Sequence, residues 1–507
     1  MFVCVFVLLW FVQQVTTEGN GNYLLMPHSI GPSHVKDMYR MAEMLLKYAG
    51  ANVTILKYAP VTKTMEIPTP KGAHVIDFTN MDADWTMPVV DKHMWSKHKS
   101  VWDGAVMLLS AYFLGMEPCR VIATNPAFVE RLKAANYDLA IIDAFASSCN
   151  YAIMNHLQVP YIGFQPVVPV YMLERYSSVP HPFSTTAPLN SGHSDRMSFG
   201  ERVRATLYQV ILYNLAWRFH HLGIMLRIGW TNLTQSHIFS FYKLNTLVEF
   251  PKPTALTQQQ HEPHNMDGHE LTGDLRMFVD DPTSKGTIIF SMTTTGAVKR
   301  IPDHIARPLN ETLSQFTDYR IIWRKIHKDE NVTFSGKHFH VTSWFDQIGV
   351  LSHPKTRLLI THGGLTSYFE AMYFGVPMLG IPLGFDHGAN VARLERLGVC
   401  IGANKGTLHS TDLIKKVRKV LTDESMHARS VKLRGMLRDV REWLGAARNG
   451  WPVTVWWLDY VRRHRHNINA LRPKSDNVPS IIYFNVDVWL FIGMQCAIAA
   501  FFLSGDK

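Results

Sequence analysis

Short apolar runs alternate with amphipathic stretches along the first half of the chain. Residues 22–27 (NYLLMP) are apolar enough for a buried strand, a turn (HSIGPS) follows, and apolar residues then recur at helical spacing over 33–48. A second strand at 52–58 (NVTILKY) completes a strand–helix–strand unit, which is typical of a parallel sheet. Further strands are predicted at 74–78, 138–145 and 160–164, with a helix near 147–157 and helical periodicity over 199–223.

The same alternation begins again after a polar stretch at 258–270 (QQQHEPHNMDGHE), which indicates a linker or surface loop. Strands are predicted in this second half at 286–292, 319–325, 339–344, 357–362 and 378–383. Continuous apolar strands between helical segments predict a parallel sheet that is covered on both faces. We therefore expect an α/β fold of two Rossmann-like, doubly wound parallel-sheet domains, which face a cleft at the carboxyl ends of their strands.

Both ends of the chain carry apolar segments that these domains do not require. Residues 2–12 (FVCVFVLLWFV) have the length of the apolar part of a signal peptide, although no Lys or Arg precedes them. Residues 481–503 are almost entirely apolar and predict a transmembrane helix, with a buried terminal helix as the alternative because the uninterrupted part, 488–503, is short for a span. Four Asn-x-Ser/Thr sequons agree with passage through the secretory pathway, at Asn52, Asn232, Asn310 and Asn331.

Composition changes this picture little. A chain of 507 residues with 47% hydrophobic and 18% charged residues is long enough for two or three domains and is not disordered. The formal net charge of +10 favours anionic partners such as phosphates, nucleic acid or lipid head groups, or is simply spread over the surface. Between the apolar ends only Cys119, Cys149 and Cys400 remain, so at most one internal disulfide can form there, and a Cys119–Cys149 bridge is conceivable.

The segment 358–377 (LLITHGGLTSYFEAMYFGVP) carries the strongest chemical signal. It predicts a strand, a His-Gly-Gly turn and a helix that ends at Gly375. Glycines before a helix let the backbone approach a phosphate, and the free N–H groups of the first turn then face the anion. His362 and Ser367 add donors, and the Glu370 carboxylate, one turn deeper on the same face, suits a diol such as ribose. Taken alone, this pattern would also fit a purely structural turn.

The neighbouring segments remove that ambiguity. WFDQIGVLSHPKTRLLITHGG (344–364) and GIPLGFDHGAN (380–390) closely resemble the signature of the UDP-glycosyltransferase family, which runs Trp-x-x-Gln, His-x-Gly, Ser, Glu and Asp-Gln. The resemblance extends along the chain and includes Ser291 after the first strand of the second half. It implies a fold of the GT-B type, a signal peptide and a C-terminal anchor, as in microsomal and invertebrate members. It also divides the chain into a signal peptide (1–17), an N-terminal acceptor-binding domain (18–257), a C-terminal UDP-sugar-binding domain (258–450), a helical return with a basic juxtamembrane segment (451–480) and a transmembrane helix (481–503).

The resemblance also implies roles for individual residues. Trp344 would stack on uracil, Gln347 would contact the uridine and Glu370 would hold the ribose hydroxyls. The remaining UDP-sugar contacts would come from His362, Gly364 and Ser367 at the diphosphate, from Ser291 and Thr294 across from it, and from Asp386 at the sugar hydroxyls. The chain departs from the family at His387, which replaces the Gln of Asp-Gln, and at Thr293, which replaces a glycine beside the phosphates.

A base for the reaction is predicted in the first half. His34 lies between the first strand and the first helix, where the family places its catalytic histidine, with His28 as a neighbouring rival. Asp143, at the end of the strand DLAIID, matches the aspartate partner that would orient the imidazole and stabilise its cation. A histidine suits this duty at neutral pH. The scheme needs no metal and no cofactor, and the Asp82-Ala83-Asp84 triplet is interpreted as a solvated loop.

These features predict an inverting UDP-glycosyltransferase of the endoplasmic reticulum membrane, with its catalytic domains in the lumen. It would move a hexose, with glucose favoured, from a UDP-sugar to a hydroxyl of a small lipophilic acceptor such as a phenol, steroid or other xenobiotic. Glucuronic acid or N-acetylglucosamine as the sugar, and a catalytically silent ligand-binding or partner-binding member, remain the alternatives. Nucleic-acid binding is not expected, because a lumenal protein without a recognised module offers no support for it. The sequence leaves a homo-oligomer open.

Overall fold

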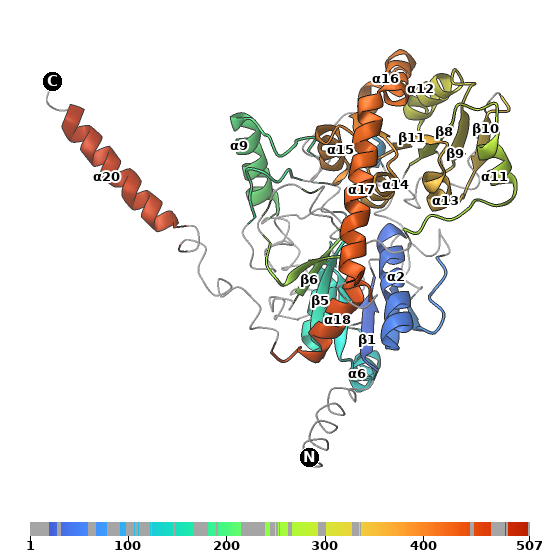
Figure 1. Ribbon diagram of the computed structural model, residues 1–507. Coiled ribbons are helices and arrows are strands. Elements are labelled where there is room, and N and C mark those ends of the chain that lie inside the picture. The colour runs from blue at the N-terminus through green and yellow to red at the C-terminus, as the bar shows by residue number, and fades with distance from the viewer. Residues whose placement is uncertain are drawn as a thin grey trace, which may run out of the picture.

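The computed structural model consists of two α/β domains, each built on a parallel sheet (Figure 1). The structure describes residues 20–27, 32–58, 67–78, 92–97, 106, 110, 122, 124–145, 148–166, 181–188, 191–213, 239–243, 249, 252, 254–261, 266–292, 301–326, 334, 336–446, 451–467, 482 and 485–504. The expected signal peptide, the rival His28, the Asp82–Asp84 triplet, Thr293 and Thr294 lie outside these residues.

The first sheet has seven strands in the order β3-β2-β1-β4-β5-β6-β7, and every described pair is parallel. The strands are β1 (Asn22–Met26), β2 (Asn52–Tyr58), β3 (His74–Phe78), β4 (Leu139–Asp143), β5 (Tyr161–Gln165), β6 (Phe239–Tyr242) and β7 (Gln258–Gln260). Helices α2 (Pro32–Ala49), α6 (Pro126–Ala134), α7 (Ser148–Leu157) and α9 (Phe199–Leu207) accompany it, and a π-helical turn at Tyr208–Tyr213 continues α9. All residues of β4 and β5 are buried, as continuous apolar strands predict.

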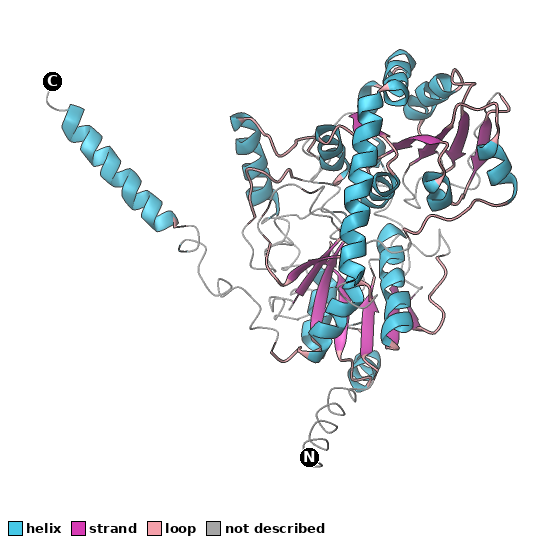
Figure 2. Cartoon of the chain, in the orientation of Figure 1, coloured by secondary structure: helices cyan, strands magenta, loops and turns pink. Residues whose placement is uncertain are grey.

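The second sheet has six parallel strands in the order β10-β9-β8-β11-β12-β13. They are β8 (Thr287–Ser291), β9 (Arg320–Arg324), β10 (Phe339–Thr342), β11 (Thr356–Thr361), β12 (Met378–Gly380) and β13 (Cys400–Gly402). The helices are α11 (Gly273–Asp280), α12 (Asp303–Leu313), α13 (Gln347–Ser352), α14 (Leu365–Phe374), α15 (His387–Arg396), α16 (Ser410–Thr422) and α17 (Glu424–Ala446), with a 3₁₀ turn at Lys405–Thr407. Figure 2 shows the two sheets with helices around them. The expectation of two doubly wound, Rossmann-like domains is therefore confirmed.

Each domain packs against segments that come from the other half of the chain. The predicted polar linker contributes β7, which pairs with β6, so the first sheet continues past residue 257, where we expected its domain to end. Helix α17 leads from the second domain back toward the first (Figure 1), and α18 (Val453–Arg463) buries Val455 and Leu458 in the same core as Met38 of α2. In the opposite direction, Trp95 packs in the core of the second domain with Trp323. Hydrophobic burial on both sides therefore joins the two domains.

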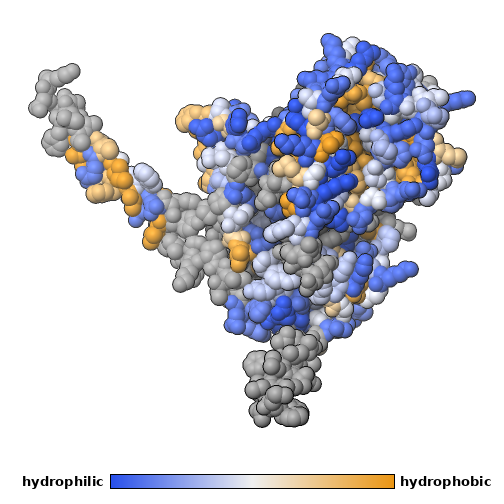
Figure 3. Space-filling view, viewed as in Figure 1, coloured by the Kyte–Doolittle hydropathy of each residue, from blue (hydrophilic) through white to orange (hydrophobic). Residues whose placement is uncertain are grey.

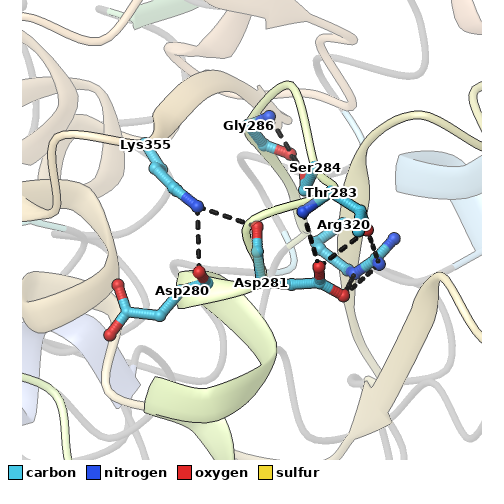
Figure 4. A network of polar contacts seen from close by, with 7 residues as sticks. All are labelled: Asp280, Asp281, Thr283, Ser284, Gly286, Arg320 and Lys355. Carbon is cyan, nitrogen blue, oxygen red and sulfur yellow. Dashed lines mark hydrogen bonds and ion pairs between the residues drawn. The ribbon is translucent and has the colours of Figure 1, made fainter.

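A polar network supports the second sheet at the amino ends of its strands (Figure 4). Asp281 accepts hydrogen bonds from the Arg320 guanidinium and from the Thr283 backbone N–H, at 2.8 Å for the latter. The Arg320 hydrogen bond lowers the pKa of the Asp281 carboxyl group. Lys355 donates to the backbone oxygens of Asp280 (2.9 Å) and Asp281 (2.8 Å). Lys355, in the segment HPKTR (353–357) that leads into β11, therefore joins the turn before β11 to the one before β8. Both turns lie at the amino ends of the strands, opposite their carboxyl ends.

The expected C-terminal membrane helix is not shown. Helix α20 (Val486–Ser504) covers most of the segment, and among the described residues no helix is long and apolar enough to cross a membrane. The exposed apolar side chains of α20 include Trp489 and Leu490. Figure 3 shows hydrophobic surface along this helix. As for the cysteines, Cys149 is disulfide-bonded and Cys400 and Cys496 are free, while Cys119 lies outside the described residues.

Candidate active site

His34 and Asp143 lie together at the carboxyl end of the first sheet. His34 is in the first turn of α2, which follows β1, and Asp143 is the last residue of β4, which is the neighbour of β1 in the sheet. The His34 Nδ1 atom is 2.8 Å from Asp143 Oδ2, and the exposed fractions of the two side chains are 13% and 0%. The Phe145 backbone N–H donates to Asp143 Oδ1 at 2.9 Å. This pairing fixes the Nδ1–H tautomer of His34 and makes Nε2 its proton-accepting atom.

Aromatic contacts connect this pair to the second domain. Phe145 makes an edge contact with the His34 ring, with ring centroids 5.9 Å apart, and another with Phe385 at 6.2 Å. Phe385 directly precedes Asp386, the residue expected at the sugar hydroxyls. Since Phe145 follows β4 and Phe385 follows β12, the carboxyl ends of the two sheets face each other. Sequence analysis did not single out either phenylalanine.

Gln347 joins Glu370, which like Gln347 is expected at the nucleoside, to Ser367, which is expected at the diphosphate. Gln347, at the start of α13, donates from Nε2 to Glu370 Oε2 at 2.6 Å and to Ser367 Oγ at 3.3 Å. Burial raises the pKa of the Glu370 carboxyl group, although the Gln347 hydrogen bond opposes that shift. Glu370 and Ser367 lie on one face of α14, as their spacing predicted. A carboxylate held in this way is well placed to accept hydrogen bonds from a diol.

Trp344 is 62% exposed, which is unusual for the largest apolar side chain. Its backbone N–H donates to the Thr342 hydroxyl at 3.2 Å, and that hydroxyl donates to the Trp344 carbonyl at 2.6 Å. The turn after β10 is thereby fixed and presents the indole ring to solvent. An exposed ring on a fixed turn is suited to stack against a planar ligand.

The His-Gly-Gly turn is as tight as its glycines suggest. Gly363 has φ +84°, and a Cβ there would lie 2.8 Å from Val391 Cγ2, so a larger residue would push α15 away. Gly364 is the N-cap of α14 and carries no side-chain cap, and the helix ends at Gly375 with φ +74°. The N–H groups of the first turn of α14 are therefore oriented to meet an anion.

His362, directly after β11, is half-buried and packs against His387. The two rings are perpendicular with centroids 4.5 Å apart, and His362 Nδ1 has no hydrogen-bond partner among the described residues. Burial, helped by His387, lowers the pKa of His362 well below its ordinary value. A neutral imidazole with an unused buried polar atom is able to hydrogen-bond an oxygen of a ligand.

Asp386 and Gly363 are joined by Asn390, which sequence analysis quoted within GFDHGAN but assigned no role. Asn390 Nδ2 donates to Asp386 Oδ2 at 2.9 Å and to the Gly363 carbonyl at 2.8 Å. Burial raises the pKa of Asp386, opposed by the Asn390 hydrogen bond. His387 lies beside Asp386, with Nε2 4.0 Å from Asp386 Oδ1. The loop expected at the sugar is thus attached directly to the turn expected at the diphosphate.

A buried ion pair between Arg393 and Glu249 holds the Asn390 side chain in place. Arg393 donates to Asn390 Oδ1 and to the Glu249 carboxylate, and also to the Tyr368 hydroxyl at 3.4 Å. Breaking one side of such a buried pair costs about 3–5 kcal/mol. Because Glu249 comes from the first half of the chain, no local pattern could have paired it with Arg393.

A second buried ion pair lies in the first domain and is hydrogen-bonded to the second. Lys243, after β6, donates to Asp37 Oδ2 and to Thr366 Oγ1, both at 2.6 Å, and the Lys243 and Asp37 side chains are almost fully buried. Asp37 is one turn after His34 on α2, and Thr366 is in the first turn of α14. Lys243 therefore fixes the helix of the candidate base relative to the helix of the candidate phosphate site.

Ser291 ends β8, is buried, and lies beside Thr361 of β11 in the register of the sheet. This position places it next to the His-Gly-Gly turn in the same sheet, whereas the sequence-based prediction put it across from the diphosphate on the other side of the cleft. Among the described residues no group of three or more His, Cys, Asp and Glu side chains is arranged to hold a metal ion.

A histidine–aspartate pair that faces a His-Gly-Gly turn across two parallel-sheet domains is the arrangement expected of a glycosyltransferase of the GT-B type. The chain matches the family "UDP-glucoronosyl and UDP-glucosyl transferase" over residues 34–506, and it belongs to that family. It is similar to UDP-glucuronosyltransferase 2A2 of Mus musculus, with 26% identity over 81% of this chain and 76% of the relative. It is also 26% identical to UDP-glucuronosyltransferase 2A2 of Homo sapiens, over 78% of this chain and 73% of the relative.

Solved structures show the same fold. A UDP-glucose:anthocyanidin 3-O-glucosyltransferase in complex with UDP superposes with a TM-score of 0.58 at 14% identity, over 87% of this chain and 99% of the other. The glycosyltransferase of kitacinnamycin superposes with a TM-score of 0.56 at 15% identity, over 87% and 99% of the two chains. The protein is therefore a UDP-glycosyltransferase.

Proposed function

We propose that the protein is an inverting transferase that moves a hexose, glucose in the first instance, from a UDP-sugar to a hydroxyl of a small lipophilic acceptor. The observation that carries the proposal is the 2.8 Å contact between His34 Nδ1 and buried Asp143, across from the hydrogen-bonded group of Gln347, Ser367 and Glu370. A buried carboxylate that binds Nδ1 prepares a histidine to take up a proton at Nε2.

In this reaction His34 accepts the proton of the acceptor hydroxyl as its oxygen attacks the anomeric carbon. The bond between that carbon and the UDP oxygen breaks on the opposite side, so the configuration inverts. Asp143 stabilises the imidazolium that forms. The negative charge that develops on the departing UDP is stabilised by the N–H groups of the first turn of α14 and by neutral His362. No metal or other cofactor takes part, and the UDP-sugar is a co-substrate.

The donor would lie along α13 and α14. Trp344 would stack on uracil, Gln347 and Glu370 would bind the ribose, and Gly364, Ser367 and Ser291 would surround the diphosphate. Asp386 and His387 would hold the sugar hydroxyls, with Asn390 fixing the Asp386 carboxylate. Thr294 stays a prediction from the sequence.

Glucuronic acid is the second candidate sugar, because the relatives at 26% identity carry the name UDP-glucuronosyltransferase. Glucose is supported by the resemblance to invertebrate members and by the glucosyltransferase among the similar structures. Both sugars present hydroxyls that would donate hydrogen bonds to the Asp386 carboxylate. A panel of UDP-sugar donors distinguishes between the two.

The test is UDP release by purified protein with a panel of UDP-sugars and one simple phenol as the acceptor. His34→Ala should abolish release, whereas His156→Ala, which changes an exposed histidine of the same domain, should not. Release with UDP-glucose that disappears only in His34→Ala supports the proposal. UDP binding without release, with any donor and several acceptors, would instead favour a catalytically silent member of the family.

We also propose that the catalytic domains lie in the lumen of the endoplasmic reticulum. The support is the apolar segment at 2–12 and the sequons, of which Asn52 is exposed on β2. An endoglycosidase that shifts the mobility of the wild-type protein but not of a variant without its four sequons would support this location. Unchanged mobility of the wild-type protein would argue against it.

A further inference from the structure

Helix α2 carries another charged side chain besides Asp37, that of Lys36, which contacts the second domain. Lys36 Nζ lies over the ring of Trp344, 4.6 Å from its centroid, and Arg324 Cζ, at the end of β9, lies 5.3 Å from the same centroid. Contacts of this length are cation–π interactions. The exposed indole that is proposed to receive uracil is therefore already in contact with a cation from the acceptor domain. Neither Lys36 nor Arg324 belongs to the sequence motifs.

Burial and two arginines oppose the positive charge of Lys36. Burial has the largest effect on its pKa, Arg324 and Arg40 follow, and Glu370 of α14 and Asp37 of its own helix act in the opposite direction with smaller effects. The pKa of Lys36 is lowered to about 8 as a result. An ammonium group in such a place gains from a ligand that brings hydrogen-bond acceptors.

We propose that Lys36 is a donor-binding residue supplied by the acceptor domain, which hydrogen-bonds the O4 carbonyl oxygen of the base stacked on Trp344 and thereby selects uracil over cytosine. The inference rests on the proposed function, in which Trp344 receives the base. An ammonium group has three donors and no acceptor. Uracil offers it carbonyl oxygens, whereas cytosine places an amino donor where uracil has one of them.

The contact of Lys36 with uracil has a second consequence. His34 and Lys36 are in the first turns of the same helix, so a uracil ring that binds Lys36 also positions the helix that carries the proposed catalytic histidine. Binding of the correct nucleotide is therefore coupled to the placement of His34. A donor with the wrong base would lose both affinity and alignment.

The experiment measures the affinities of the full-length protein for UDP and CDP by calorimetry. Lys36→Met keeps the length of the side chain and removes its charge, and Lys36→Arg keeps the charge. Lys47→Met makes the same change at an exposed position of α2. We expect Lys36→Met to bind UDP about tenfold more weakly and CDP with little change, because a hydrogen bond to a charged group is lost only with UDP. Lys36→Arg and Lys47→Met should stay close to wild type.

A pH series gives an independent test with the wild-type protein. As the pH rises from about 7 to about 9, Lys36 loses its proton, so UDP affinity should fall in the wild type and much less in Lys36→Arg. Equal UDP affinities of wild type and Lys36→Met would overturn the contact. Equal losses for UDP and CDP would overturn the base selection. If the wild-type protein binds no UDP at all, the proposed function itself fails, which is a different result.

Discussion

The histidines at the carboxyl ends of the two sheets have opposite environments. His34, which follows β1, is paired through Nδ1 with the buried carboxylate of Asp143 at 2.8 Å. His362, which follows β11, is half-buried, packs against the ring of His387 and has a buried Nδ1 atom without a partner among the described residues. Loss of solvation lowers the pKa of His362 well below its ordinary value. One histidine therefore has a carboxylate partner, and the other is kept neutral by its surroundings.

The difference fits the proposed roles of the two domains. In the proposed reaction the first domain removes a proton from the acceptor, so its histidine would need a counter-charge for the imidazolium. The second domain would hold a diphosphate that gains negative charge, and a neutral donor can stabilise that charge without releasing or binding a proton during the reaction. The same residue type at equivalent ends of two similar sheets thus acquires different chemistry from its neighbours.

The largest expected effect comes from removing the counter-charge. Asp143→Asn keeps the shape of the side chain but no longer stabilises the imidazolium, so kcat should fall about 1,000-fold. UDP affinity should be unchanged, because Asp143 lies in the other domain. Asp318→Asn, which alters an exposed carboxylate on the surface, is the matched control. A kcat within threefold of wild type would show that His34 does not depend on Asp143.

A smaller effect is expected at the neutral histidine. His362→Ala removes one donor to the developing charge and should lower kcat/KM about 100-fold, while His362→Gln, which keeps a neutral donor, should recover part of it. The kcat–pH profile should have the same shape in wild type and His362→Gln. A shift of that profile would mean that His362 exchanges a proton in the reaction, and the contrast with His34 would then be wrong.

The contrast could be predicted only in part from the sequence. Local periodicity predicted the strands and helices on either side of each histidine, and the pairing of His34 with Asp143 agrees with the order of the first sheet, because β1 and β4 are neighbours. Apolar runs report burial within one element, and therefore the strands were located to within a few residues. Strands β6, β7 and β13, each three or four residues long, were not predicted, and β7 lies in the polar stretch that was interpreted as a linker.

Contacts between distant segments left no signal in the sequence. Lys243 meets Thr366, Glu249 meets Arg393 and Lys36 meets Trp344, yet the members of each pair are more than a hundred residues apart. Periodicity says which face of a helix is polar, but it does not say which partner that face will find across a domain boundary. The environment that lowers the pKa of His362 depends on such packing, so its neutral state could not have been predicted from the sequence.

An intermediate effect is expected where the sugar loop joins the His-Gly-Gly turn. Asn390→Ala removes the hydrogen bonds to Asp386 and to the Gly363 carbonyl, so KM for the UDP-sugar should rise about tenfold with a smaller change in kcat. Gln315→Ala removes an exposed amide and serves as the control. If kcat fell with no change in KM, Asn390 would act in the transition state and not in holding the donor loop.

The smallest effect concerns stability and tests the neutral state of His362 without any substrate. The folded protein keeps His362 unprotonated, whereas the unfolded chain binds a proton near pH 6.5, so stability is complete above that pH and falls as the pH decreases. The expected loss is about 1.4 kcal/mol per pH unit for each such group. His261 in the first domain, whose pKa burial lowers to about 3, adds the same dependence there.

The measurement is urea unfolding between about pH 6.5 and about pH 5 for wild type, His362→Gln and His261→Gln. Each substitution removes one group that binds a proton on unfolding, so the free energy of unfolding should fall less steeply as the pH decreases. The effect should appear in the domain that contains the substituted histidine. Gln315→Ala, which changes an exposed amide of the second domain, is the control and should lose stability in acid as the wild type does. An equal loss of stability in wild type, His362→Gln and His261→Gln would show that burial keeps neither histidine neutral, and the environment assigned to His362 would then be wrong.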